Sequence, residues 1–191
     1  MADFHIQTGI LMLNYILSRR YLVLNMFFFV FSILSHYCSS CPSLVSGIRA
    51  GKRNNGLEIF TRSFPCFKEL RSIFYVDKVK IIPDNIYELL TPVALAHMIM
   101  GDGSVSRHGL VLCTNSYRLE EVVLLMNVLM IRYELECTIH KKRRNQKIEH
   151  MIYIRQGSMP SLLNIVSPYM HESMLYKLKS SLSKPSNVNK I

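Results

Sequence analysis

The stretch LAHMIMGDGS, from Leu95 to Ser104, constrains the fold most, because it is an apolar run that ends abruptly in an acid. Thr91 followed by Pro92 is typical of a helix N-terminus, so we expect a helix that continues until Gly101 stops it. Apolar residues occupy nearly every side of this helix, which must therefore be buried against several partners. An acid at the end of a buried helix is unfavourable unless it is paired, hydrated or bound to a metal ion.

Asp102 is this acid, and it stands between Gly101 and Gly103. The glycines allow the backbone to approach a ligand closely, and a carboxylate together with water and phosphate oxygens suits Mg²⁺. A metal ion there would act as a Lewis acid and activate water for phosphodiester cleavage. Gly-Asp-Gly is also a common turn after a helix, and these residues alone leave both interpretations open.

The charge balance points to a polyanionic partner. The chain has 23 Lys and Arg against 13 Asp and Glu, a formal net charge of +10 and a pI near 9.5. Nucleic acid or an anionic membrane surface would fit this charge. The five cysteines are odd in number and irregularly spaced, which argues against a disulfide framework. Cys38 and Cys41 have the spacing of half a zinc site, but the other cysteines stand alone.

An almost unbroken apolar run extends from Tyr21 to Leu34. It is shorter than the roughly 20 residues needed to span a bilayer, and it contains Asn25. We expect a buried helix here. A membrane anchor is the alternative.

The first half of the chain then shows a ribbon and a helix. Two extended stretches between Leu44 and Phe60 flank the basic segment KRNNG, and its Asn55-Gly56 pair predicts the hairpin turn. Pro65 begins a segment with helical apolar spacing.

The second half repeats this order after the Gly101 stop. A hairpin is expected to turn at Arg107-His108-Gly109, and a long helix spans Tyr117 to Tyr133. The basic segment HKKRR, His140 to Arg144, begins a second ribbon. A helix at Pro160 follows, and then a basic tail from Lys177 onward.

This repetition can be followed residue by residue. Tyr37 matches Tyr133 and Arg49 matches Arg144 at an offset of 96 or 95, and both registers contain a Ser-x-Pro helix start. The pattern predicts two copies of one structural unit, residues 1–82 and 83–191.

Leu95 to Gly103 is similar to the signature of the LAGLIDADG homing endonucleases. The segments LVLCTNSY, HKKRR, SMPSLL and PYMHESMLYKL resemble the fungal, organelle-encoded subgroup, which carries a LAH variant of the motif. The resemblance covers roughly Ser35 to Lys179. It implies an α+β, homing-endonuclease-like fold of two αββαββα units with antiparallel DNA-binding sheets. The two motif helices would pack side by side, and each would end in an acid that binds divalent metal.

The resemblance also implies an activity: Mg²⁺-dependent hydrolysis of phosphodiester bonds in double-stranded DNA. Asp102 would be catalytic and a metal ligand, with the Gly101 carbonyl as a second contact. His97 and Gly101, four residues apart on one helix face, would meet the partner helix. Either Lys141 or Lys142 would lie near the scissile phosphate. The residues expected to contact DNA are Arg49, Lys52, Arg53, Arg62, Arg107, Lys141, Lys142, Arg143, Arg144 and Arg155.

The N-terminus departs from the family pattern. The offset of about 95 puts the first motif at or before residue 1, and ADFHIQTG resembles the strand that should follow that motif. We therefore expect a first unit truncated before its acid. A longer product or a second copy would supply the missing helix, or else cleavage has been lost.

Two other functions stay open. One is a non-catalytic nucleic-acid-binding protein, such as an RNA maturase that assists splicing of its own intron. The other is a basic protein anchored to a membrane by Tyr21 to Leu34. The family resemblance implies synthesis in a fungal mitochondrion, which agrees with the lack of a convincing transit peptide.

Overall fold

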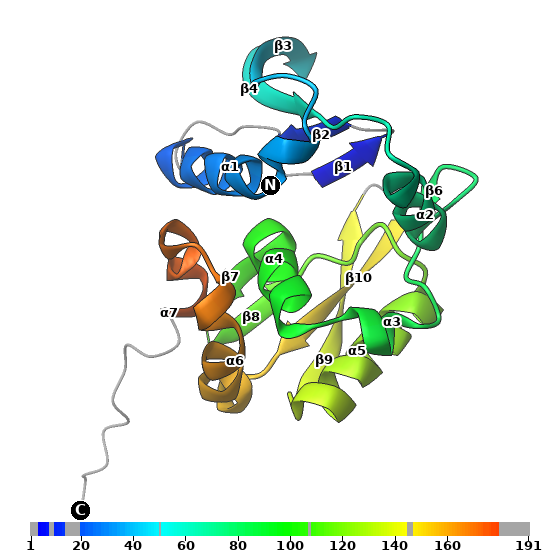
Figure 1. Cartoon of the computed structure of the whole chain (residues 1–191). Coiled ribbons are helices and arrows are strands. Elements are labelled where there is room, and N and C mark those ends of the chain that lie inside the picture. The colour runs from blue at the N-terminus through cyan, green and yellow to red at the C-terminus, as the bar shows by residue number, and fades with distance from the viewer. Residues whose placement is uncertain are drawn as a thin grey trace, which may run out of the picture. The chain divides into compact units, whose positions relative to one another are not determined.

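A computed structural model describes residues 4–7, 10–13, 20–49, 51–106, 108–144 and 147–179. The chain divides into two compact units, each with its own four-stranded antiparallel sheet (Figure 1). The first unit comprises Met1–Pro83 and His171–Met174, and the second comprises Asp84–Met170 and Leu175–Ile191. The α+β fold class is confirmed.

The four-stranded sheet of the first unit is built from two hairpins separated by a helix. Its elements are β1 (Phe4–Gln7), β2 (Ile10–Leu13), α1 (Arg20–Leu34), η1 (Ser35–Tyr37), β3 (Ser43–Arg49), β4 (Lys52–Phe60), α2 (Pro65–Phe74), β5 (Tyr75–Val76), β6 (Val79–Lys80) and η4 (Glu172–Met174). The sheet order is β1-β2-β4-β3, and β5 pairs with β6 in a separate two-stranded sheet.

The apolar run predicted to be a buried helix is α1. Phe27 is 1% exposed and packs in a core with Cys38 and Ile59. The hydroxyl of Ser173 donates to the Leu22 carbonyl over 3.1 Å, which ties the short segment His171–Met174 to α1. In the part of the chain that the structure describes, no helix is long and apolar enough to cross a membrane.

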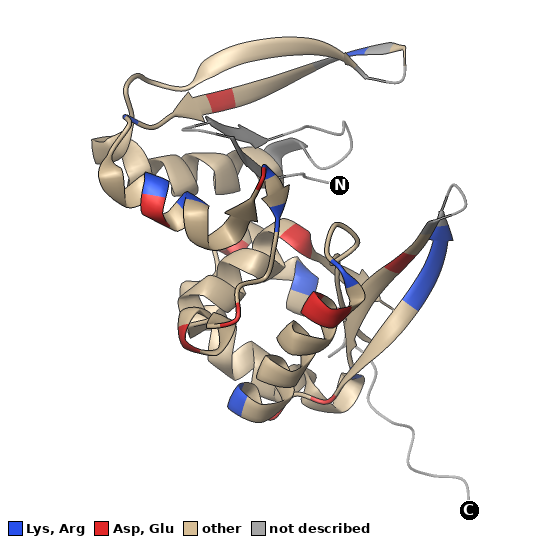
Figure 2. Ribbon diagram, turned by 90° about the vertical axis from the view of Figure 1, so that its right-hand side faces the viewer, with Lys and Arg blue, Asp and Glu red and all other residues tan. Residues whose placement is uncertain are grey.

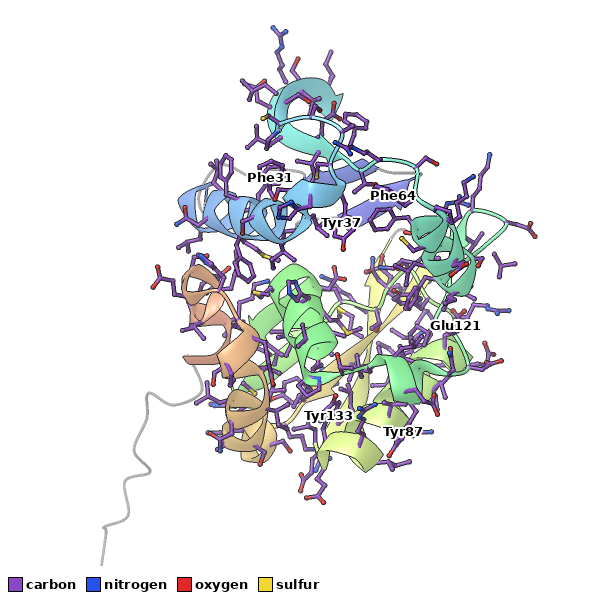
Figure 3. The ribbon with its side chains drawn as sticks, viewed as in Figure 1. Phe31, Tyr37, Phe64, Tyr87, Glu121 and Tyr133 are labelled. Carbon is purple, nitrogen blue, oxygen red and sulfur yellow. The ribbon has the colours of Figure 1, made fainter. Side chains whose placement is uncertain are left out.

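The Cys38 and Cys41 side chains have different environments. Cys38 is buried and its thiol donates to the Leu34 carbonyl over 3.2 Å, whereas Cys41 is exposed. Beside this core, the rings of Tyr37 and Phe64 meet edge to face with centroids 6.0 Å apart (Figure 3).

The turn of the first ribbon differs from the prediction. Arg49 pairs with Lys52, so the chain reverses between them, and Gly51 has a φ of +74°. Asn55 and Gly56 instead lie within β4. The prediction of a turn at Asn55-Gly56 was wrong. The seven backbone pairs between β3 and β4 set the register of this hairpin, and this register places the reversal at Gly51.

The second unit repeats the order of hairpin, helix, hairpin and helix, and two helices, α3 and α4, precede its first hairpin. Its elements are α3 (Ile86–Leu89), α4 (Pro92–Asp102), β7 (Gly103–Ser106), β8 (Gly109–Leu112), α5 (Leu119–Tyr133), β9 (Cys137–Arg144), β10 (Lys147–Ile154), η2 (Gln156–Ser158), α6 (Met159–Val166), η3 (Ser167–Tyr169) and α7 (Tyr176–Lys179). The sheet order is β7-β8-β10-β9. From α4 to α6 this is the predicted αββαββα unit.

The two units share a register as well as a topology. The ladder from Phe4↔Leu13 to Gln7↔Ile10 recurs as Gly103↔Leu112 to Ser106↔Gly109, a constant spacing of 99 residues. The same spacing relates α1 to α5, and it shortens to about 95 for the second hairpin. The predicted internal repeat is therefore present, and its first half has a spacing about four residues longer than we expected.

The core of the second unit lies between the helices and one face of the sheet. Leu95 and Ile99 of α4 and Leu125 of α5 are fully buried, as are Leu112 and Ile152 of the sheet. At the far end of α5, the Arg132 guanidinium donates to the Tyr87 carbonyl and lies over the Tyr87 ring. Tyr87 and Tyr133 are labelled in Figure 3.

Candidate nucleic-acid interface and acidic site

Asp102 is the last residue of α4, and Gly103 is the first residue of β7. The helix begins as predicted, because the Thr91 hydroxyl accepts from the Ala94 N–H over 3.2 Å. A Cβ atom at position 103 would lie 2.5 Å from the Ile99 carbonyl oxygen. Only glycine therefore allows this helix to pass directly into the strand, which holds Asp102 half-buried at the junction.

The β7–β8 ladder extends one pair beyond the strands. The Cys113 N–H donates to the Asp102 carbonyl over 3.0 Å, so these two residues lie opposite each other. Successive residues of a strand alternate between faces, and Gly103 and Leu112 are on the buried side. Asp102 and Cys113 therefore belong to the opposite face of the sheet, which we call the outer face.

The outer face of the second sheet is the face away from the buried side chains of Leu110, Leu112, Ile152 and Ile154. Strand alternation and the observed register assign to it Ser104, Ser106, Val111, Cys113, Thr138, His140, Lys142, Glu149, Met151 and Tyr153.

The register between β9 and β10 distinguishes Lys141 from Lys142, which the sequence alone did not do. Lys142 pairs with Glu149 on the outer face, whereas Lys141 pairs with His150 on the face that carries Ile152. Both lysines are exposed because β9 extends beyond the core. Lys142 therefore shares a face with Asp102, and Lys141 does not.

Lys177 is a further basic residue at this site. Its ammonium donates to the Met100 carbonyl over 2.6 Å and to the Ile99 carbonyl over 3.2 Å, and the residue is only 9% exposed. The last carbonyls of a helix lack partners within the helix, and a cation is favourable beside them. The sequence prediction missed Lys177 by placing it at the start of a basic tail. Its position between the apolar residues Met174 and Leu178 was the available signal.

The pKa of the Cys113 thiol responds to the charges of Asp102, Lys142 and Lys177. Burial and the Asp102 carboxylate raise the pKa of the Cys113 thiol. A hydrogen bond with Ser104 and the positive charges of Lys177 and Lys142 act in the opposite direction, with a smaller combined effect. The acid and both lysines thus act on one thiol.

The remaining residues predicted to contact DNA lie in or next to the hairpin strands, and Figure 2 shows Lys and Arg on both strands and helices. Arg53, Arg62, Arg143 and Arg155 are exposed, and Arg155 lies 3.6 Å from a carboxylate oxygen of Glu136. The backbones of Arg49, Lys52 and Arg144 end or begin hairpin strands, but their side chains lie outside the described part, as does the whole of Arg107.

The expected helix interface follows one stripe of α4. His97 and Gly101 are half-buried and four residues apart, on the same stripe as the exposed Val93. Burial lowers the pKa of His97. The imidazole therefore favours its neutral form.

The donors at the end of α4 fit a magnesium ion that keeps water and phosphate ligands. Among the described residues, no group of three or more His, Cys, Asp or Glu side chains could hold a metal ion. Mg²⁺ commonly takes only one or two carboxylates together with water and substrate phosphates. Asp102 with the Gly101 carbonyl is such a partial set.

An acid at a helix-to-strand junction, on a two-hairpin sheet that carries Lys142, in a chain with a net charge of +10, defines an α+β protein suited to binding a polyanion. A family model for the LAGLIDADG DNA endonucleases matches residues 4–162. The chain belongs to this family.

Two relatives agree with this assignment. The cytochrome b mRNA maturase bI2 of Debaryomyces hansenii is 35% identical over 144 residues, which cover 74% of this chain and 54% of that protein. The intron-encoded endonuclease ai4 of Dictyostelium discoideum is 39% identical over 122 residues, 63% of this chain and 76% of that one. This chain thus spans about half the length of the maturase.

The fold matches that of the homing endonuclease I-WcaI bound to its DNA recognition sequence. The TM-score is 0.77 at 24% identity, over 93% of this chain and 80% of the other. At this identity the match shows the fold, and the homing-endonuclease-like architecture is confirmed.

Proposed function

We propose that this chain acts as an intron-encoded homing endonuclease that hydrolyses phosphodiester bonds of double-stranded DNA with Mg²⁺. The observation that carries the proposal is the position of Asp102, at the end of α4 and on the same sheet face as Lys142. The major groove of B-DNA is wide enough for a two-stranded ribbon such as β9–β10. The basic residues named above would contact its phosphates and base edges.

Each group at the site has a proposed role. Asp102 and the Gly101 carbonyl would hold Mg²⁺, which supplies Lewis acidity and lowers the pKa of water when bound. Lys142 would neutralise a phosphate at the outer face. Lys177 positions Asp102, because it anchors the last turn of α4, and its charge offsets the negative charge of the acid and the phosphate.

The shared register supports a second acid within this chain. Asp3 directly precedes β1, as Asp102 directly precedes β7, and the ladders that follow match at a spacing of 99 residues. Asp3 lies outside the described residues. We propose Asp3 as the counterpart of Asp102, in place of an acid upstream of residue 1.

The test is cleavage of plasmid DNA that carries the intron-insertion junction, with Mg²⁺ or Mn²⁺. Asp102→Asn should abolish cleavage and leave DNA binding, measured by gel shift, largely intact. Lys142→Ala should reduce cleavage strongly, while the matched variant Lys141→Ala, on the opposite face, should have a small effect. Asp3→Asn should behave like Asp102→Asn. A folded chain that binds this DNA but never cuts it would contradict the proposal.

A second candidate function is RNA maturation. The Debaryomyces relative is named an mRNA maturase, and a maturase would use the basic faces without needing the acids. Splicing of the host intron that persists in the Asp102→Asn variant would separate this role from cleavage. For either role we propose synthesis in the mitochondrion, as the family resemblance implies.

A further inference from the structure

His140 and Tyr153 form a stacked pair of rings on the outer face of the second sheet. Their ring centroids are 4.7 Å apart and the ring planes differ by 16°. The Thr138 hydroxyl lies 3.4 Å from Nε2 of His140, which helps to fix the imidazole. Neither ring has a role in the metal binding or phosphodiester cleavage proposed above.

The sheet backbone accommodates the pair at Gly109. A Cβ atom at position 109 would lie 2.9 Å from the Tyr153 hydroxyl oxygen and 2.2 Å from the Ile154 carbonyl oxygen. Because Gly109 lacks this atom, the tyrosine can extend across β8. Tyr153 is half-buried, and His140, which stacks on it, is exposed. The imidazole is therefore the accessible layer of the stack.

The neighbours of the pair suit a nucleic-acid strand. β9 is an edge strand of the sheet, and Lys142 follows His140 by two residues on the same face. A phosphate on Lys142 would bring the adjacent base toward His140. In a duplex the faces of each base are covered by its neighbours, so only an unpaired base can add to this stack.

We propose that His140 and Tyr153 form a stacking platform for an unpaired nucleobase of a single-stranded nucleic acid, with Lys142 at its phosphate. The site is distinct in ligand from the duplex-cleaving site. If the platform prefers RNA to single-stranded DNA, it would serve the proposed maturase role. Only in that case does the inference rest on that role.

The probe is an oligouridine with one central 2-aminopurine, prepared as RNA and as DNA, titrated with the full chain. Binding should quench the 2-aminopurine fluorescence. His140→Ala should raise the Kd by roughly 5- to 100-fold and remove the quenching, as expected for loss of one aromatic stack. His140→Phe should keep the Kd within about twofold, because it retains a ring. His150→Ala is the matched control, since His150 lies on the opposite face of the sheet.

The comparison of the RNA and DNA probes and the comparison of the His140 variants distinguish the possible outcomes. Tighter binding of the RNA than of the DNA probe supports RNA as the source of the base, and equal binding supports the platform for any single strand. Equal losses for His140→Ala and His140→Phe would overturn the proposal, because they indicate a hydrogen bond in place of stacking. A Kd unchanged by His140→Ala, or an equal loss of duplex binding, would also overturn it. Failure of duplex cleavage alone would not affect this result.

Discussion

Cys113 lies opposite Asp102, with its N–H bonded to the Asp102 carbonyl over 3.0 Å. The Asp102 carboxylate is, after burial, the second cause that raises the pKa of the Cys113 thiol. The reactivity of the Cys113 thiol should therefore depend on the charge at position 102.

Replacement of Asp102 by Asn should make Cys113 more reactive toward iodoacetamide. The thiolate is the reactive form, and loss of the neighbouring negative charge lowers the pKa of the thiol, so a larger fraction is ionised at pH 8. The alkylation rate should rise in proportion to the thiolate fraction. Alkylation rates of individual peptides, followed by mass spectrometry, measure this effect.

Two comparisons control the alkylation experiment. Ser104→Ala should slow the reaction of Cys113, because the hydrogen bond with Ser104 lowers the pKa of the thiol. The exposed Cys66 provides an internal reference. An unchanged ratio of Cys113 to Cys66 rates in Asp102→Asn would show that the carboxylate does not act on the thiol.

Gly103→Ala should destabilise the second unit and displace Asp102. The added Cβ would lie 2.5 Å from the Ile99 carbonyl oxygen, a backbone atom that moves only if the end of α4 moves. Overpacking of this kind costs about 1–3 kcal/mol. Gly157→Ala is the matched control, because no atom lies within 4 Å of its added Cβ. Denaturant unfolding of both variants checks the prediction, and equal stabilities would refute it.

The sequence predicted the parts of the fold that depend on local signals. Thr91, Pro92 and Gly101 define the ends of α4 to within one residue, since caps and stops act over one helical turn. The choice between Lys141 and Lys142 needed the strand register, which depends on pairing between β9 and β10. Lys177 joins the site only through tertiary packing, because its partners Ile99 and Met100 are more than 70 residues away.

Cys137 should make the protein less stable at alkaline pH. Burial raises the pKa of its thiol from 9.0 to about 12. The folded state therefore keeps its proton where the unfolded state has lost it, so stability is intact below pH 9 and is lost progressively between pH 9 and 12. The free energy of unfolding should fall by about 1.4 kcal/mol at pH 10 from this group. Urea unfolding at several pH values should show that the free energy of unfolding falls less steeply above pH 9 in Cys137→Ala than in wild type. Parallel pH profiles of the two proteins would exclude this effect of Cys137.

Glu134→Gly should stabilise the second unit. Glu134 ends α5 with a φ of +54°, a left-handed conformation that costs most residues about 1 kcal/mol or more and costs glycine little. The Leu135 N–H donates to the Leu129 carbonyl over 3.2 Å, so this conformation is part of the helix end. We expect a gain of about 0.5–1 kcal/mol and a rise in Tm of about 1–4 °C. Glu120→Gly, in the first turn of the same helix, should instead lower the Tm, because it adds backbone entropy without relieving strain. Thermal unfolding followed by circular dichroism distinguishes the two, and a lower Tm for both would show that the conformation at Glu134 is not strained.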